Sequence, residues 1–366
     1  MLIQSGKVFI DSEFRQCDLR IENGLVVELG EDLPLEECEP VYDAAGCYVL
    51  PGLFDIHMHG AVGEDFSDAS PEGLFRMVEY ERSCGITAFC PTSMSLGKDA
   101  LIEVFRNGKA VAERCPQIYG FHMEGPFLNL KRKGAQKEEH IVAPDKSLFD
   151  ACYEASGMRI KKLTLAPETD GALELIRNLQ GMVKISLGHT GADYDCAARA
   201  FSEGVSQVTH LFNAMPGLNH RQPGIIGAAY DNKEVYVELI ADGVHVHDSM
   251  IRAAFSMFGD RVILVSDSMR ATGLGDGEYS LGGQRVRVNG KKAVLADGTI
   301  AGSVTNLFEC MKHCIDIGIS AEKAVAAATL NPAKVLGAEE QIGMISVGRK
   351  ADLVIVDDRF RLLKVF

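Results

Sequence analysis

The sequence predicts an α/β protein: a (β/α)₈ TIM-type barrel with a small β-sandwich domain formed by both chain ends. Eight short apolar runs end in polar residues, and helix-like segments fill several of the gaps between them. The length agrees, because 366 residues leave about a hundred beyond the roughly 200 to 250 of a typical barrel.

Both ends of the chain show the pattern of short strands. Residues 1–50 contain strand-like runs and an Asn23-Gly24 pair, which is typical of a hairpin turn. Residues 342–366 contain two further runs, GMISVGRKADLVIVD and RLLKVF. Since neither end is long enough to enclose a core alone, we predict that 1–50 and 342–366 pair into one domain. The barrel then spans 51–341.

The middle of the chain alternates apolar runs with helix-like segments. The runs are GLFDIHMH, ITAFCPTS, IYGFHMEG, LTLAPE, VKISLGHT, QVTHLFN, VYVELIADGVH and VILVSDS. Unbroken apolar runs indicate strands covered on both faces, as in a parallel sheet. The clearest helix-like segments are 70–85, 100–115, 192–204 and 247–260. A doubly wound open sheet is the rival fold.

Composition and charge exclude several classes of partner. The chain is 46% hydrophobic and 24% charged, which favours a folded protein with a large core. A net charge of -14 argues against nucleic acid and anionic membranes, because both are bound mainly through clustered Lys and Arg. The polar N-terminal segment and ten scattered cysteines without a CxxC motif predict reduced thiols and a cytoplasmic location.

Metal-ligand side chains stand at the ends of several predicted strands. His57 and His59 are two residues apart, so both imidazoles face one side of a strand. Glu124, His189 and His210 end three other runs. Each residue alone has a structural explanation, such as a solvated loop, a hydrogen-bonded core or a turn cap. Together they predict one site for a divalent Zn, Fe, Mn or Co ion at the mouth of a barrel.

Further polar residues lie near this predicted site. Asp267 ends the eighth run, where it either caps a turn or acts as a general base. His245 and His247 follow the seventh predicted strand. His245 suits a substrate contact, and His247 suits a helix start. Arg221 lies in a Gly- and Pro-rich loop. Its guanidinium suits a phosphate group, although a solvated surface Arg is an equal alternative.

The motifs LPGLFDIHMHG, HMEGPFLN, KGAQ, LGHT, THLFNAM, ADGVHVH, SDSMRATG, AGS and GRKADLVIVD together resemble the amidohydrolase superfamily and, within it, the N-acetylglucosamine-6-phosphate deacetylase family. The resemblance implies metal-dependent deacetylation of N-acetyl-D-glucosamine 6-phosphate to D-glucosamine 6-phosphate and acetate, in amino-sugar catabolism. It implies Glu124, His189 and His210 as principal ligands and Asp267 as the catalytic acid and base. The implied substrate-binding residues are Ala135, Gln136, Asn213, Ala214, Arg221, His245, Ala301, Gly302 and Ser303.

Two features bear on the metal and the substrate carbonyl. Some family members lack the His-x-His pair and hold one metal, whereas His57 and His59 are present here. We therefore expect one or two ions per subunit. Gln136 stands where other members place a histidine that polarises the substrate carbonyl. Either its amide or a second metal is then expected to take over that task.

Three alternatives stay open at the level of sequence. No motif distinguishes N-acetylglucosamine 6-phosphate from its galacto epimer. A cyclic amidase is disfavoured because such enzymes usually carry a carboxylated lysine as bridging ligand, where this chain supplies Glu124. A non-catalytic, metal-stabilised barrel is disfavoured because Asp267 and all ligands are present.

The resemblance to the deacetylase family also implies a homodimer or higher homo-oligomer, with Arg221 reaching phosphate across the subunit interface.

Overall fold

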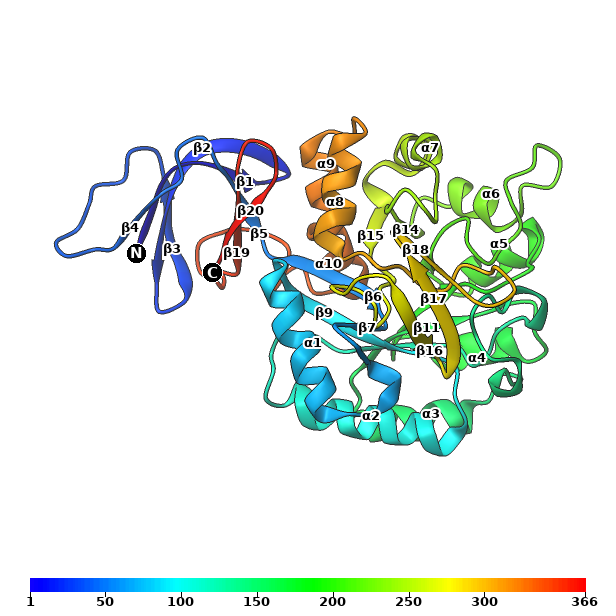
Figure 1. Ribbon diagram of the computed structural model, residues 1–366. Coiled ribbons are helices and arrows are strands. Elements are labelled where there is room, and N and C mark those ends of the chain that lie inside the picture. The colour runs from blue at the N-terminus through cyan, green and yellow to red at the C-terminus, as the bar shows by residue number, and fades with distance from the viewer.

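Eight parallel strands form the barrel at the centre of the computed structural model, which describes residues 1–366 (Figure 1). In chain order they are β6 (Leu53–Met58), β9 (Ile86–Ser93), β10 (Phe121–Glu124), β11 (Ile160–Leu165), β12 (Lys184–Leu187), β13 (Gln207–Val208), β14 (Tyr236–Ile240) and β15 (Val262–Val265). Neighbours in the chain are neighbours in the sheet. Seven of the predicted apolar runs contain one of these strands, and the run LTLAPE covers the second half of β11. The predicted fold class is confirmed.

Backbone hydrogen bonds at the ends of the first and last strands close the barrel at its mouth. Asp267 N donates to His57 O over 2.9 Å, and His59 N donates to Ser268 O over 2.8 Å. These bonds join the segment after β15 to the end of β6. The closure therefore places Asp267 beside the His-x-His pair.

A helix follows each barrel strand. These helices are α1 (Pro71–Ser83), α2 (Lys98–Ala112), α3 (Lys146–Ala155), α4 (Ala172–Asn178), α5 (Tyr194–Ser202), α6 (Gly224–Asp231), α7 (Asp248–Phe258) and α8 (Leu307–Asp316), with α9 (Ala321–Ala328) and α10 (Leu330–Leu336) after them. The side chains of Ser70, Asp193 and Asn306 cap α1, α5 and α8 by accepting first-turn backbone N–H bonds. All four predicted helix segments are confirmed.

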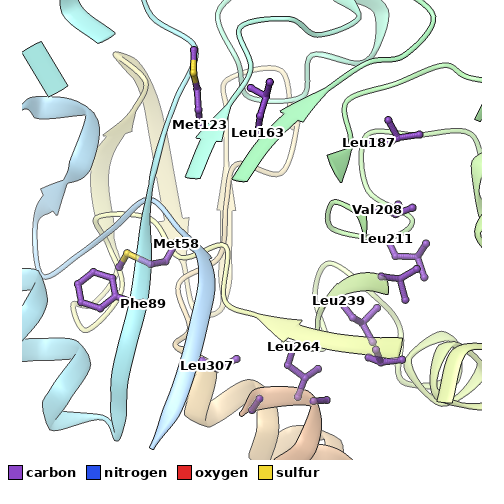
Figure 2. Packing of buried hydrophobic residues seen from close by; sticks show 14 of the residues in the cluster. Met58, Phe89, Met123, Leu163, Leu187, Val208, Leu211, Leu239, Leu264 and Leu307 are labelled. Atoms are coloured by element: carbon purple, nitrogen blue, oxygen red, sulfur yellow. The ribbon is translucent and has the colours of Figure 1, made fainter. Parts of the chain in front are cut away.

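The main hydrophobic core lies between the strands and the surrounding helices. It is one cluster of 68 buried residues, and each fully buried Leu, Ile or Phe side chain contributes about 1.5–3 kcal/mol to folding. Figure 2 shows one member from every barrel strand: Met58, Phe89, Met123, Leu163, Leu187, Val208, Leu239 and Leu264. Because side chains alternate along a strand, the residues between these core members face the barrel interior.

The two chain ends form one small β-domain beside the barrel, and both termini lie in it (Figure 1). Its strands are β1 (Leu2–Ile10), β2 (Glu13–Glu22), β3 (Leu25–Gly30), β4 (Val41–Asp43), β5 (Tyr48–Pro51), β19 (Leu353–Val356) and β20 (Leu362–Val365). Because β1 pairs with β2, β4 and β5, and β5 with β19, they belong to one seven-stranded sheet rather than two separate ones. The sheet has its own core of 12 buried residues.

A three-stranded antiparallel sheet between β15 and α8 was not predicted. It consists of β16 (Gly277–Leu281), β17 (Gln284–Asn289) and β18 (Lys292–Val294). Leu281 packs in a small cluster with Met94, Ala135 and Met269, at the mouth of the barrel. The remaining short elements are β7 (Gly60–Ala61), β8 (Glu64–Asp65), η1 (Phe66–Asp68), η2 (Leu130–Arg132), η3 (Glu138–His140) and η4 (Gly259–Arg261). All ten cysteines are unpaired, and none of the helices is both long and apolar enough to span a bilayer.

Candidate metal centre

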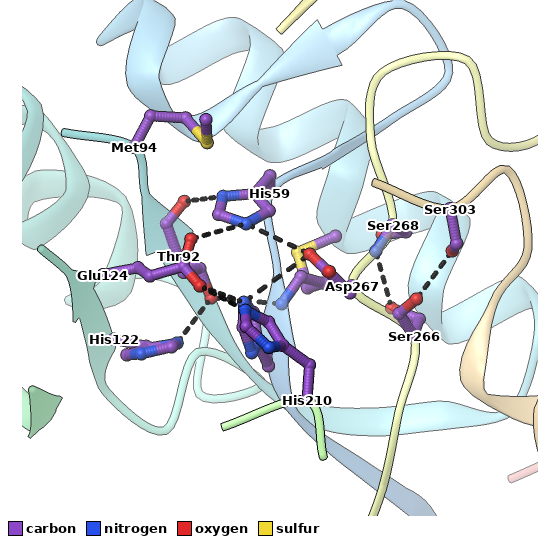
Figure 3. Close-up of polar contacts among 12 residues, drawn as sticks. His59, Thr92, Met94, His122, Glu124, His210, Ser266, Asp267, Ser268 and Ser303 are labelled. Carbon is purple, nitrogen blue, oxygen red and sulfur yellow. Dashed lines mark hydrogen bonds and ion pairs between the residues drawn. The ribbon is translucent and has the colours of Figure 1, made fainter. Parts of the chain in front are cut away.

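Five metal-ligand side chains converge at the mouth of the barrel. Figure 3 labels three of them, His59, Glu124 and His210. His57 lies in β6 and Glu124 ends β10, while His59, His189 and His210 follow the ends of β6, β12 and β13. All five are buried. Their ligand atoms form two groups, His57–His59–Glu124 and Glu124–His189–His210, and within each group the atoms lie within 4.8 Å of one another. The two groups share Glu124.

Glu124 is the common partner of the four imidazoles. Its Oε1 lies 3.3 Å from His189 Nε2, 3.2 Å from His210 Nε2 and 3.4 Å from His57 Nε2. Its Oε2 lies 3.4 Å from His59 Nε2. The Glu124 carboxylate therefore belongs to both groups of candidate ligands.

The polar atoms of this centre fit a divalent cation better than they fit one another. His57 Nε2 and Glu124 Oε1 are buried without a hydrogen-bond partner. His189 Nε2 and His210 Nε2 point at each other over 3.1 Å, a contact that requires a proton on one of the two nitrogens. Buried polar atoms without partners are costly, and a bound ion would satisfy them together. The residues present therefore suit one or two divalent ions.

The electrostatics of the five side chains lead to the same conclusion. Burial alone would lower the pKa of His57, but the Asp267 and Glu124 carboxylates outweigh it and raise the pKa to about 9. Burial alone would raise the pKa of Glu124, but the His189 and His57 rings bring it well below its ordinary value. The carboxylates thus attract positive charge into a buried site, and a divalent ion supplies such charge.

Asp267 stands beside the first group of ligands. Its Oδ1 lies 3.2 Å from His59 Nε2 and 3.6 Å from His57 Nε2. Burial alone would raise its pKa, but these two rings lower it to about 2, so the side chain is a carboxylate at neutral pH. The Ser303 N–H donates to Asp267 O over 2.8 Å and helps to fix the backbone.

Three site residues have left-handed backbone conformations. The φ angles of His189, His210 and Asp267 are 47°, 31° and 48°. Such conformations cost about 1–3 kcal/mol for residues other than glycine and are held by the surrounding structure. The chain turns sharply at the end of each strand, and the turn directs the side chain toward the shared centre.

Gln136 contacts Glu124 directly. Its Nε2 donates to Glu124 Oε2 over 2.7 Å, and its Oε1 accepts from Ser95 N over 2.8 Å. The side chain is buried at the wall of the pocket. One of its two amide hydrogens is therefore used to orient the carboxylate, and the other remains for a ligand.

A pocket of about 350 Å³ opens over this centre. Of the residues predicted to meet substrate, its wall contains Ala135, Gln136, Asn213, Ala214, His245 and Gly302. It also contains residues that were not predicted: Met94, Lys131, Arg132, Gly134, Leu281, Thr299 and Ile300. Leu281, in β16, brings the unpredicted three-stranded sheet to the pocket. The wall thus combines cationic, polar and apolar groups, as a small charged ligand requires.

Three residues expected at the pocket lie elsewhere in the chain's own structure. Arg221 is exposed and borders a separate surface hollow with Asp193 and Tyr194. Ala301 and Ser303 are buried behind Gly302, and Ser303 Oγ donates to a strand-end carbonyl over 2.6 Å instead of facing the pocket. Within one subunit, Arg221 therefore cannot line this pocket.

Three buried charged residues near the site were not predicted. Asp242 Oδ2 lies 2.8 Å from His245 Nδ1 and orients that ring toward the pocket. Lys162 and Glu238 pair inside the barrel, and Glu238 also contacts His57. A signal was present in the sequence for Glu238, which interrupts the otherwise apolar run VYVELI, whereas Lys162 stands beside a second lysine, Lys161, in IKKLTL. His247 caps α7 and was expected at a helix start.

A (β/α)₈ barrel with such a ligand set and a carboxylate beside it defines a metal-dependent hydrolase. The model of the amidohydrolase family, whose members are metal-dependent, matches residues 48–366. The N-acetylglucosamine-6-phosphate deacetylase of Bacillus subtilis (strain 168) is 39% identical over 92% of this chain and 87% of its own length. The N-acetylgalactosamine-6-phosphate deacetylase of Escherichia coli O157:H7 is 31% identical over 95% of this chain and 91% of its own.

Solved structures of such deacetylases also resemble this chain in their fold. A mutant N-acetyl-D-glucosamine-6-phosphate deacetylase from Mycobacterium smegmatis, in complex with N-acetyl-D-glucosamine-6-phosphate, superposes with a TM-score of 0.94 at 32% identity. The match covers 100% of this chain and 97% of that one. The chain belongs to the amidohydrolase family and, within it, to the N-acetylglucosamine-6-phosphate deacetylases. It is a hydrolase that acts on an amide bond.

Proposed function

We propose that the protein hydrolyses N-acetyl-D-glucosamine 6-phosphate to D-glucosamine 6-phosphate and acetate, as a step of amino-sugar catabolism in the cytoplasm. The observation that carries the proposal is Asp267, which lies 3.2 Å from His59 beside the shared Glu124 at the base of a polar pocket. The Mycobacterium smegmatis enzyme, whose structure superposes on this chain with a TM-score of 0.94, was solved in complex with this sugar phosphate.

The residues around the centre have separate roles in the proposed reaction. A divalent ion bound by Glu124, His189 and His210 would supply Lewis acidity and lower the pKa of a neighbouring water molecule. Asp267 is a carboxylate at neutral pH, so it can accept a proton from the attacking water and deliver it to the departing amine. The free amide hydrogen of Gln136 can donate to the acetamide oxygen as negative charge develops there.

The pocket wall provides groups for the sugar and its phosphate. Asn213, Ala214 and Gly302 line it with small polar or backbone groups, and His245 is oriented into it by Asp242. Burial alone would lower the pKa of His245, but its bond to Asp242 raises the pKa above its ordinary value, which favours a cationic donor. These residues suit hydroxyl and phosphate oxygens.

The number of metal ions and the oligomeric state also belong to the proposal. We propose that His57 and His59 hold a second ion together with Glu124, the metal being Zn, Fe, Mn or Co. We also propose a homodimer in which Arg221 reaches the phosphate bound by the neighbouring subunit. The exposed position of Arg221, outside its own subunit's pocket, supports this arrangement.

Acetate release by purified, metal-analysed protein tests the function. The 6-phosphates of N-acetylglucosamine and N-acetylgalactosamine should be compared with unphosphorylated N-acetylglucosamine. We expect kcat/KM to be highest for N-acetylglucosamine 6-phosphate and lowest for the sugar without phosphate. A higher kcat/KM for the galacto epimer would reassign the substrate, and no release from any of the three would refute the proposal.

A further inference from the structure

Glu238 is a fully buried carboxylate inside the barrel, beneath the metal-binding side chains. It lies in β14, between strand residues that face the main hydrophobic core. Its Oε2 lies 3.0 Å from His57 Nδ1, and its Oε1 pairs with Lys162 Nζ from β11. Both Lys162 and Glu238 are 0% exposed, and neither lines the pocket.

The Glu238 carboxylate contacts ligands from both halves of the candidate metal centre. Besides His57 Nδ1, its Oε2 accepts a long hydrogen bond of 3.4 Å from the backbone N–H of His210. The carbonyl of Glu238 accepts from Leu211 N over 2.7 Å, which ties β14 to the segment that carries His210. One buried side chain therefore joins β6, β11, β14 and the end of β13.

The contact with His57 determines which ring nitrogen carries the proton. A carboxylate accepts but cannot donate, so the proton of the neutral ring must lie on Nδ1, facing Glu238. Nε2 then keeps its lone pair, and this nitrogen faces Glu124 Oε1 over 3.4 Å. An imidazole needs that lone pair to bind a metal, and an outer carboxylate is a common means of orienting it.

Lys162 supplies the charge that a buried carboxylate requires. An isolated carboxylate is costly to bury, and Lys162 is the only Lys or Arg side chain that pairs with Glu238. Stability alone does not account for the pair, because a buried ion pair is often no more stabilising than well-packed apolar residues of the same size. A role in orienting the His57 ring accounts for the presence of this pair.

We propose that the Lys162–Glu238 pair is a positioning device that fixes the Nδ1–H tautomer of His57, and thereby enables His57, His59 and Glu124 to bind an ion. The inference rests on the second metal position of the proposed function and is independent of the substrate. Neither residue lines the pocket, so both are positioning residues rather than catalytic ones.

Two double variants separate this role from a purely structural one. Lys162→Met with Glu238→Gln removes both charges but keeps an oxygen that can accept from His57 Nδ1–H. Lys162→Met with Glu238→Met also removes both charges and has a similar shape, but it lacks the acceptor. Neither variant leaves an unpaired buried charge, so their comparison isolates the hydrogen bond. His57→Ala defines the amount of metal that depends on His57.

The measurement is zinc bound per subunit, by elemental analysis after dialysis against buffered zinc, with circular dichroism as the check of folding. We expect the Glu238→Gln double variant to bind as much zinc as the natural sequence. The Glu238→Met double variant should bind the His57-dependent ion at least about tenfold more weakly, while keeping the ion of Glu124, His189 and His210. Equal zinc binding by both double variants would overturn the proposal, and so would equal binding by His57→Ala and the natural sequence.

A second measurement does not depend on any variant folding. In the zinc-loaded natural protein, ¹⁵N NMR of labelled histidine should show His57 protonated at Nδ1 and unprotonated at Nε2. The opposite tautomer would overturn the proposal. Because neither experiment measures acetate release, a failure of the proposed deacetylation would leave both results interpretable.

Discussion

Replacing Asp267 by Asn tests the proposed proton transfer with little disturbance of the structure. Asp267 has a φ of 48°, a left-handed conformation that Asn adopts more readily than most residues. The two side chains have the same shape, and the backbone bonds to His57 and Ser303 do not involve the side chain. We therefore expect the variant to fold and to keep its metal ligands.

The expected loss follows from the position of the carboxylate. Asp267 Oδ1 lies 3.2 Å from His59 Nε2, beside the centre where water would be activated, and an amide cannot accept and return a proton there. A positioned general acid and base contributes about 10²- to 10⁴-fold to a rate. This corresponds to about 3–5 kcal/mol of activation free energy. The loss should appear in kcat, with KM changed much less.

The assay is acetate release from N-acetylglucosamine 6-phosphate, measured beside the metal content and the thermal unfolding midpoint of each protein. Asp358→Asn is a matched control, since Asp358 is exposed in the β-domain and should keep full activity. If Asp267→Asn keeps more than about a tenth of the natural kcat with its metal bound, Asp267 is not the proton carrier.

Three other predictions concern stability and the metal. Burial raises the pKa of Glu81 well above its ordinary value, with the Asp55 charge adding to the shift. The folded chain therefore holds this proton more tightly than the unfolded chain, and its free energy of unfolding decreases as pH rises above the ordinary Glu pKa. Glu81→Gln should raise the unfolding midpoint more at about pH 8 than at about pH 5, and an equal change at both would contradict this. Phe105→Ala should lower the free energy of unfolding in urea by about 3–5 kcal/mol, because Phe105 is fully buried against Phe66 and Phe121; a loss below about 1 kcal/mol would contradict the packing. Dialysis against a strong chelator should abolish acetate release and lower the unfolding midpoint, with zinc or cobalt restoring both; full activity without metal would refute a metal-dependent reaction.

Much of the fold and of the centre could be predicted from local patterns. Apolar runs predict the barrel strands because strands covered on both faces need few polar side chains. His57, His59, Glu124, His189 and His210 stand at strand ends, and parallel strands bring these ends to one edge. Strands β16–β18 bury only one face, so they lack the unbroken apolar runs of the barrel strands; the signal that could have found them is the alternation of exposed Arg285 and Arg287 with buried Val286 and Val288 in β17.

The sequence by itself determined the barrel, the pairing of both chain ends and the kinds of side chain available for a metal. Only the tertiary structure decided which of them meet. His57 and Glu238 are 181 residues apart in the chain, and Lys162 and Glu238 are 76 apart. The tertiary structure also directs Gln136 toward Glu124 and places Arg221 outside the pocket. The physical reason is that periodicity reports which face of an element is buried, whereas contacts between distant elements depend on the register and closure of the whole barrel.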